Sequence, residues 1–263
     1  MEGTEELSLE KWIRDKRAYV WCFGKNSNGE LGVQTTKDVV EPRPLHNGPA
    51  LFKEAGSARG VSSGGHHTAL VTKSGHLYMC GSTLHGKLGI QGLNMMQVTK
   101  FQPLPMPVAV KQVACGDYHS MCLTEDGQVF SWGGSLYKKL ANVSGNSEPS
   151  LVNGLNRIVA IDCGDFHSLA LDEEGRLFTW GGGGASYNKG QCGHGTNDDC
   201  EVPKQVALHS KVIKVSAGGF HTLALCEGQE LFAWGNSAHG ECGFGDFTES
   251  SKPRLVKLDE ELV

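Results

Sequence analysis

The chain has no long hydrophobic run, no surplus of positive charge and few aromatic residues. No window approaches the roughly 18 apolar residues that cross a bilayer, so we expect no membrane span. Four of the nine residues after Met1 are glutamates, so a secretory signal with a basic end and an apolar core is not expected. The formal net charge of −5 argues against a nucleic-acid partner held through its phosphates. These absences predict a cytoplasmic or nuclear protein.

Glycine, by contrast, is abundant, with 36 residues among 263, while hydrophobic residues make up 39% and charged residues 20% of the chain. This balance is typical of a folded, turn-rich all-β protein rather than of a disordered one. Short aromatic segments that end in glycine recur along the chain. They read VWCFG, LYMCG, VFSWG, LFTWG and LFAWG, and they end at Gly24, Gly81, Gly133, Gly181 and Gly235. The steps of 48 to 57 residues between these glycines predict a stacked or radial array of one supersecondary unit.

Each full copy of this unit carries four strand signals separated by turns. The first is a segment in which apolar and polar residues largely alternate, such as residues 108–116. The second opens with a histidine, at His67, His119, His167 and His221. A short turn, such as Asp-Gly at 126–127, leads into the aromatic strand, which carries Trp132, Trp180 and Trp234 in the last three copies. The fourth strand is expected to open with a proline three positions before Val or Leu, at Pro42, Pro105, Pro149, Pro203 and Pro253.

Four strands per unit, with each sheet packed on the next around an axis, describe the blades of a β-propeller. A single unit is too thin to bury a core, so neighbouring units must stabilise one another. Residues 19–45 hold only the second half of a unit. We therefore predict an all-β propeller of about four full blades and a half blade over residues 19–258, with a lead at 1–18 and a tail at 259–263. Within the lead, Leu9, Trp12 and Ile13 have helical spacing, which fits a capping helix, a disordered lead or a docking helix for a partner.

The repeated pattern resembles the regulator of chromosome condensation family. The motif is Gly-x-x-His-Ser/Thr, with a turn glycine eight residues after the histidine and Trp-Gly at thirteen and fourteen, and it is complete from His119 to Gly133 and from His167 to Gly181. The resemblance covers residues 19–258 and implies a propeller. Members of the family usually close a ring of seven blades, so it implies here a partial or open propeller, a fragment or splice form, or a ring completed by another chain.

The repeat histidines are expected to be structural, with a ring nitrogen bonded to the backbone at a strand start. Equivalent residues of neighbouring blades lie too far apart to share a metal at bonds of about 2 Å. A second group of soft ligands, Cys192, His194, Cys200 and His209, lacks the Cys-x-x-Cys spacing of zinc sites. The nine cysteines are read as reduced thiols, mostly at small or apolar packing positions. We expect no metal, no cofactor and no catalytic residue.

The run Gly181–Gly184 is followed by neither the lysine nor the helix of a phosphate-binding loop, so we expect it to form a contact loop on one face. The candidate contact residues are Gly182, Gly183, Gly184, Tyr187 and Trp12. The resemblance also implies an ultraviolet-B receptor role, but this role needs tryptophans two places before the repeat histidines, and those places hold Gly65, Asp117, Asp165 and Gly219.

Two functions remain. The first is a non-enzymatic interaction or scaffold module whose partner is a small GTPase, a complex subunit or a chain that completes the propeller, with no small-molecule substrate. The second, implied by the resemblance, is a guanine nucleotide exchange factor or regulator of a Ran-like small GTPase. That activity needs a protruding wedge, for which the chain offers only residues 46–60 and the glycine-rich loop.

Overall fold

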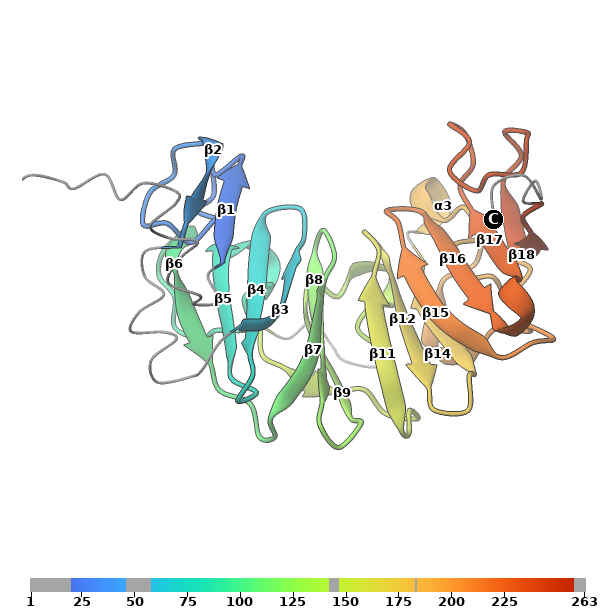
Figure 1. Cartoon of the computed structure of the whole chain (residues 1–263), viewed down its shortest axis with the longest axis horizontal. Helices are drawn as coiled ribbons and strands as arrows, with labels where there is room; N and C mark the ends of the chain where they lie inside the picture. Colours follow the sequence, from blue (N-terminus) through green and yellow to red (C-terminus); the bar gives the residue numbers. More distant parts are fainter. Residues whose placement is uncertain (1–19, 46–57, 142–146, 183, 258–263) are drawn as a thin grey trace, which may run out of the picture.

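The computed structural model describes residues 20–45, 58–141, 147–182 and 184–257, and within these it is nearly all β-structure. The strands form four four-stranded sheets and one two-stranded sheet, and every pair of neighbouring strands is antiparallel. Figure 1 shows the sheets side by side in an open arc that runs from the N-terminal pair to the C-terminal sheet, whose ends do not meet. The predicted partial propeller of four full blades and a half blade is confirmed.

The elements follow the repeat closely. The half-sheet consists of β1 (Trp21–Gly24) and β2 (Val39–Pro44). The first sheet contains β3 (Ala58–Ser63), β4 (His67–Thr72), β5 (Leu77–Ser82) and β6 (Gln97–Leu104). The second contains β7 (Val110–Cys115), β8 (His119–Thr124), β9 (Val129–Gly133) and β10 (Ser150–Leu151). The third contains β11 (Ile158–Cys163), β12 (His167–Asp172), β13 (Leu177–Gly181) and β14 (Cys200–Gln205). The fourth contains β15 (Val212–Ala217), β16 (His221–Cys226), β17 (Leu231–Gly235) and β18 (Ser250–Leu255).

Short helical turns lie in the connections: η1 (Leu84–Gly86), η2 (Leu136–Lys138), α3 (Gly184–Tyr187) and η3 (Glu227–Gln229). The turn α3 corrects the expectation that no helix follows the glycine run, although a single turn of four residues is too short to present the ordered N-terminus of a phosphate site. No helix among the described residues is long and apolar enough to cross a membrane.

The repeat glycine and the repeat histidine lie opposite each other in every full sheet. In the first sheet His67 pairs with Gly81, and the same register recurs in the other three. Gly81 has a φ of +111°, and a Cβ there would lie 2.5 Å from the carbonyl oxygen of His66. The glycine is therefore required both by its backbone conformation and by the close approach of the histidine strand.

The predicted start of the fourth strands is wrong. None of the fourth strands begins at its proline: β2, β14 and β18 begin three residues earlier and β10 begins one residue later. Strand β6 runs over Gln97–Leu104 and ends before Pro105, which lies in the connection to β7. Leu104 is the last residue of the strand because it pairs with Leu77, the first residue of the neighbouring strand β5, and its side chain is buried in the core between the first and second sheets. In β2, β14 and β18 the proline lies within the strand, and all three are edge strands, where a missing N–H costs no ladder bond.

The core lies between the sheets. We call the side of a sheet that faces the next sheet along the chain its forward face, and the opposite side its backward face. One cluster joins Leu77 and Met79 of the first sheet to Val113 and Trp132 of the second. Equivalent clusters join the second sheet to the third, the third to the fourth and the half-sheet to the first. Each interior therefore consists of one forward face and one backward face, as a stack of thin units requires.

Candidate functional site

The repeat histidines bind the neighbouring sheet. In the first three of the four, the Nε2 atom lies within hydrogen-bond distance of a hydroxyl oxygen on the second strand of the next sheet; the fourth, His221, lies on the last described sheet. The pairs are His67 and Ser120 at 2.7 Å, His119 and Ser168 at 2.9 Å, and His167 and Thr222 at 2.9 Å. The sequence predicted a backbone partner for these rings, and the structure shows a side-chain hydroxyl instead.

The same hydroxyls and the repeat tryptophans share one backbone acceptor. The Ser120 hydroxyl donates to the carbonyl oxygen of Lys87 at 2.9 Å, and the Trp132 indole Nε1–H donates to that oxygen at 3.0 Å. The carbonyl oxygens of Lys139 and Gln191 play this part at the next two interfaces. Because the hydroxyl proton is directed to the carbonyl, the histidine must donate its Nε2–H. We call this arrangement the inter-sheet network.

The network leaves the histidines unsuited to acid–base chemistry. Burial lowers the pKa of His67 and of His167 to about 3, and it places the pKa of His119 well below the ordinary value. The rings are therefore neutral at physiological pH, and their Nε2–H groups are already engaged between sheets. These three histidines therefore link neighbouring sheets.

The four candidate zinc ligands find separate partners. Cys192 is buried with its Sγ near the carbonyl oxygen of Gly181, and His194 contacts the Thr179 hydroxyl. Cys200 lies against the carbonyl oxygen of Val202, and His209 pairs with Glu230. All nine cysteines are free thiols, and eight of them are buried. Burial raises the pKa of Cys115 and of Cys122 to about 12, so these thiols are poor nucleophiles.

A row of aromatic side chains crosses three sheets at the bends that precede the repeat histidines. Tyr118 stacks on Phe166 with ring centroids 5.4 Å apart, and Phe166 lies 5.7 Å from Phe220. Tyr187, from α3, stacks on Phe166 at 5.1 Å and on Phe220 at 6.2 Å. We call these four residues the aromatic row. They line a cavity of about 380 Å³ together with His85, Asp117, Gly134, Leu136, Lys139 and Asp165.

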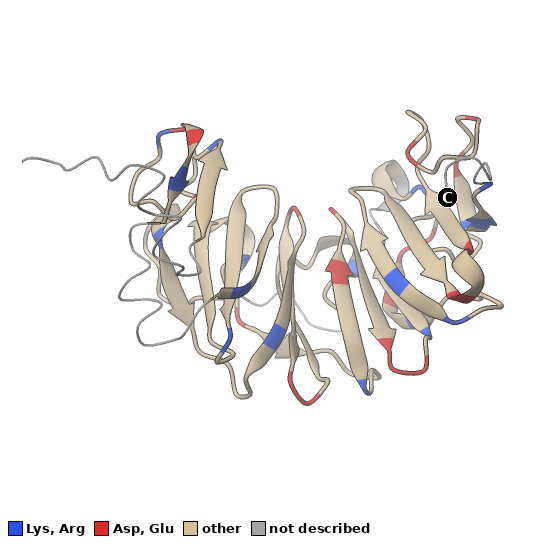
Figure 2. Ribbon diagram, in the orientation of Figure 1, with Lys and Arg blue, Asp and Glu red and all other residues tan. Residues whose placement is uncertain are grey.

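The cavity carries charge of both signs. Asp117 and Asp165 occupy equivalent bends, between β7 and β8 and between β11 and β12, which Figure 2 shows at the same end of neighbouring sheets. Burial and then the charge of Asp117 raise the pKa of Asp165. The Lys139 ammonium lies 5.7 Å from the ring centroids of both Tyr118 and Phe166, and burial lowers the pKa of Lys139 to about 8.

Glycines on the flanking sheets make room for these carboxylates. A Cβ added at Gly65 would lie 1.5 Å from an Asp117 carboxylate oxygen, and one at Gly219 would lie 2.9 Å from an Asp165 oxygen. The positions that lack the tryptophans of a light receptor thus hold two aspartates that line the cavity, flanked on the outer sheets by two glycines.

Of the predicted contact residues, Tyr187 lies in the aromatic row, Gly182 is buried beside it and Gly184 begins α3. Gly183 and Trp12 lie outside the described residues, as does most of the segment 46–60. The sequence reasoning missed Tyr118, Phe166 and Phe220. Their signal was the residue directly before the repeat histidine, which is aromatic in the last three copies.

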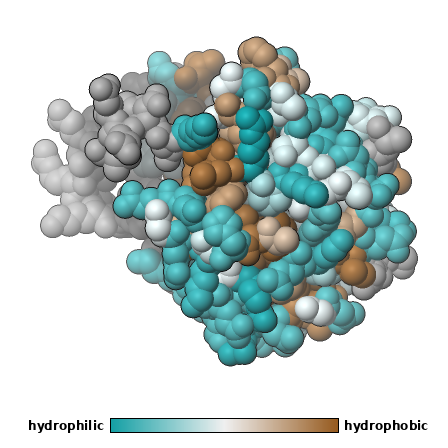
Figure 3. Space-filling view, turned by 90° about the vertical axis from the view of Figure 1, so that its right-hand side faces the viewer, coloured by the Kyte–Doolittle hydropathy of each residue, from teal (hydrophilic) through white to brown (hydrophobic). Residues whose placement is uncertain are grey.

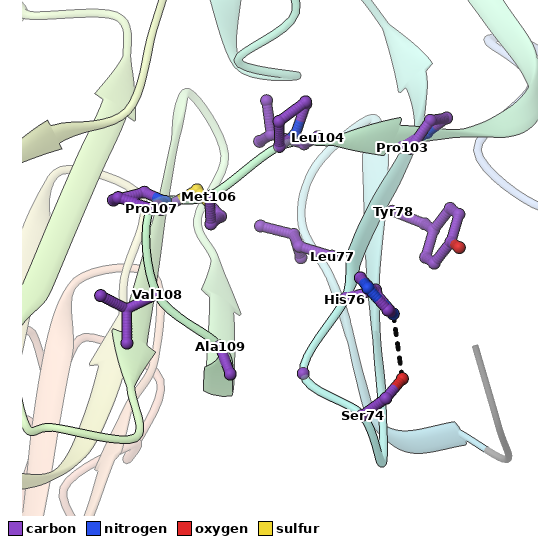
Figure 4. A pocket seen from close by; sticks show the side chains of 12 residues that line it. Ser74, His76, Leu77, Tyr78, Pro103, Leu104, Met106, Pro107, Val108 and Ala109 are labelled. Carbon is purple, nitrogen blue, oxygen red and sulfur yellow. Dashed lines mark hydrogen bonds between the residues drawn. The ribbon is translucent and has the colours of Figure 1, made fainter.

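A second cavity, of about 420 Å³, lies between the turn that joins β4 and β5 and the connection after β6. Figure 4 shows Leu77 and Tyr78 on one side and Leu104, Met106 and Val108 on the other. A smaller groove of about 170 Å³ occupies the equivalent place between the third and fourth sheets. Because the groove recurs with the repeat, it is a product of blade packing rather than a site of its own.

Three comparisons with known proteins bear on this architecture. A family profile described as the RCC1-like domain matches residues 11–263. Ultraviolet-B receptor UVR8 of Arabidopsis thaliana is 31% identical over 244 residues, which cover 90% of this chain and 53% of the relative. Secretion-regulating guanine nucleotide exchange factor of Bos taurus is 32% identical over 235 residues, which cover 85% of this chain and 49% of the relative. The chain thus spans about half the length of these two relatives.

Among solved structures, human WBSCR16 superposes with a TM-score of 0.79 at 24% sequence identity, covering 92% of this chain and 63% of that chain. At this identity the likeness shows the fold alone.

Proposed function

Because the chain belongs to the RCC1-like domain family, we propose that it is a non-enzymatic protein-interaction module and that its aromatic row is the contact surface. The observation that carries the proposal is the convergence of four aromatic side chains from three sheets around one cavity with charged groups at its edge. Aromatic side chains beside charged and polar groups are characteristic of protein interfaces. A rigid array of sheets holds them in place without the partner.

The chemistry of the cavity supports binding over catalysis. Its titratable groups are Asp117, Asp165, Lys139, His85 and two tyrosines. The buried histidines of the inter-sheet network are neutral and engaged, so they supply neither a base nor a metal ligand to this surface.

Affinity capture from cytoplasmic and nuclear extracts of the source cell, read by mass spectrometry, tests the proposal. Leu136 is 66% exposed and Tyr187 is 46% exposed, so Leu136→Asp and Tyr187→Asp change the edge of the cavity, and the second also removes the stacking of Tyr187 on Phe166. Leu151→Asp is the matched control, because Leu151 is 44% exposed and lies on β10, outside the cavity lining. A partner that wild type and the control retain, and that both cavity variants lose, supports the proposal. Equal capture by all four proteins contradicts it.

A second candidate is guanine nucleotide exchange on a small GTPase, which the name of the bovine relative suggests. The purified chain is mixed with a Ran-type GTPase that carries a fluorescent nucleotide, and the release rate is followed. Release stimulated by catalytic amounts of the chain would establish exchange. An unchanged rate at a large molar excess would exclude it for this GTPase and leave the interaction module in place.

A further inference from the structure

Among the described residues, no sheet packs on the forward face of the fourth sheet. In the third sheet the forward face presents Leu169, Leu171 and Leu177, which are buried against the fourth sheet. The same positions in the fourth sheet are Leu223, Leu225 and Leu231, which are only partly buried. The hydrophobic cluster on this forward face contains only residues of the fourth sheet and its loops. Each of the other hydrophobic clusters joins two sheets.

On this face, the place that a tryptophan ring fills at the other interfaces is open. At Gly89 and Gly193 a Cβ would lie 2.9 Å and 2.7 Å from the indole nitrogens of Trp132 and Trp234, because those rings fill the space above the glycine. At the equivalent Gly243 the nearest atom is a methyl carbon of Val256 at 3.5 Å, and the glycine is exposed. Figure 3, which looks onto this end of the molecule, shows apolar residues grouped in the middle of the surface with hydrophilic residues around them.

The half-sheet presents the matching face at the other end of the arc. Trp21 and Phe23 occupy the positions that Phe232 and Trp234 hold in the fourth sheet, where both side chains are buried against the preceding sheet. The half-sheet is the first described sheet of the chain, and in it these two side chains are 36% and 63% exposed. Cys22, between them, points the other way and packs with the first sheet.

We propose that these two faces bind each other between two copies of the chain. The backward face of one half-sheet packs on the forward face of another copy's fourth sheet, with Phe23 over Gly243. The contact repeats the geometry that joins neighbouring sheets within the chain, so it continues an interface already built four times. The two faces lie at opposite ends of the open arc (Figure 1), so they meet in trans and not within one copy.

The contact is heterologous, because different surfaces of the two copies meet. After pairing, one copy keeps a free fourth sheet and the other keeps a free half-sheet, so the assembly grows into a ring or a linear array rather than stopping at a symmetric dimer. Its driving force is burial of apolar surface, and the aromatic row takes no part in it. The inference is therefore independent of the proposed function, and either can fail alone.

Sedimentation velocity of the purified chain over a range of concentrations tests this inference. Wild type is expected to shift from monomer to dimer and larger species, while Phe23→Asp and Leu225→Asp each stay monomeric, because a carboxylate in the contact would be buried without a partner. Leu151→Asp, outside both faces, should associate as wild type does.

The sharpest arm is a mixture of the two monomeric variants. Phe23→Asp keeps an intact fourth sheet and Leu225→Asp keeps an intact half-sheet, so the mixture should form a one-to-one dimer and nothing larger. A mixture that stays monomeric overturns the heterologous contact, and so does association of either variant alone. Wild type that remains monomeric up to about 0.5 mM overturns the inference without any variant, and it leaves the faces to a different chain.

Discussion

A single hydrogen bond from each buried histidine to the next sheet explains why histidine, hydroxyl and tryptophan recur with fixed spacing. The Thr222 hydroxyl accepts from His167 and donates to the carbonyl oxygen of Gln191, which also accepts from Trp234. Losing the hydroxyl would leave the buried Nε2–H of His167 without an acceptor, and a buried unpaired donor is costly, whereas the Gln191 carbonyl oxygen would keep its bond from Trp234. The motif is therefore a device for joining sheets, and its residues need no catalytic explanation.

Thr222→Val, which keeps the shape and removes the hydroxyl, should lower the free energy of unfolding by about 1–3 kcal/mol. Thr222→Ser keeps the hydroxyl and should cost less. Urea denaturation followed by tryptophan fluorescence measures both.

The first sheet supplies a matched position. Thr68 occupies the same place in its strand, but its hydroxyl bonds to Ser63 at 3.1 Å and no repeat histidine precedes it in the half-sheet. Thr68→Val should therefore destabilise the chain less than Thr222→Val does. If the two substitutions lowered the free energy of unfolding equally, the bond from the histidine would contribute nothing beyond the replacement of a hydroxyl by a methyl group.

The buried histidines also predict a pH dependence. In the unfolded chain they titrate near 6.5, whereas in the folded chain His67 and His167 bind a proton only near pH 3. Between these values the unfolded state holds more protons, so the free energy of unfolding falls as the pH falls below about 6.5. At full effect each histidine contributes a slope of about 1.4 kcal/mol per pH unit, and above about pH 6.5 this contribution is level. Urea midpoints between pH 7.5 and 5 measure the slope. His167→Gln should have a smaller slope, and an unchanged slope would refute the assignment.

At the scale of strands and sheets, the sequence predicted the repeating unit well because turn glycines, alternation and the histidine column mark it at every copy. The half-sheet was also predictable, since residues 20–45 lack a histidine strand. The limits of the fourth strand were not. Pro105 fits the spacing of the other prolines, yet β6 ends at Leu104, opposite the first residue of β5, and the register between the two strands is not visible in the local pattern.

The half-sheet should open more readily than the sheets covered on both faces. It has two strands and one packed face, whereas β8 and β12 are buried along their whole length. Hydrogen exchange read by mass spectrometry should show faster exchange at low protein concentration in β1 than in β8 or β12. Equal protection in these strands would mean that the arc unfolds only as a whole.

At the scale of the whole molecule, the arc was predictable but its surfaces were not. Tyr118, Phe166 and Phe220 are separated by 48 residues or more in sequence, and only the stacking of the sheets brings them into one row. Tyr187 joins them from an insertion whose path the repeat does not determine. A repeat reveals which residues share a position, whereas a surface depends on how far each sheet is turned from the last.

The open arc makes stability a function of concentration if its ends bind each other. Association favours the folded state and not the unfolded one, so the free energy of unfolding of wild type should rise with protein concentration. The gain is about 2.7 kcal/mol at a concentration 100 times the dissociation constant, and the urea midpoint should rise with it. Phe23→Asp should show a midpoint independent of concentration, because its half-sheet no longer offers an apolar face. The two proteins should coincide at the lowest concentration, where both are monomers. A wild-type midpoint that stays level from about 1 to 100 μM would mean that the forward face of the fourth sheet is not covered by a second copy in this range.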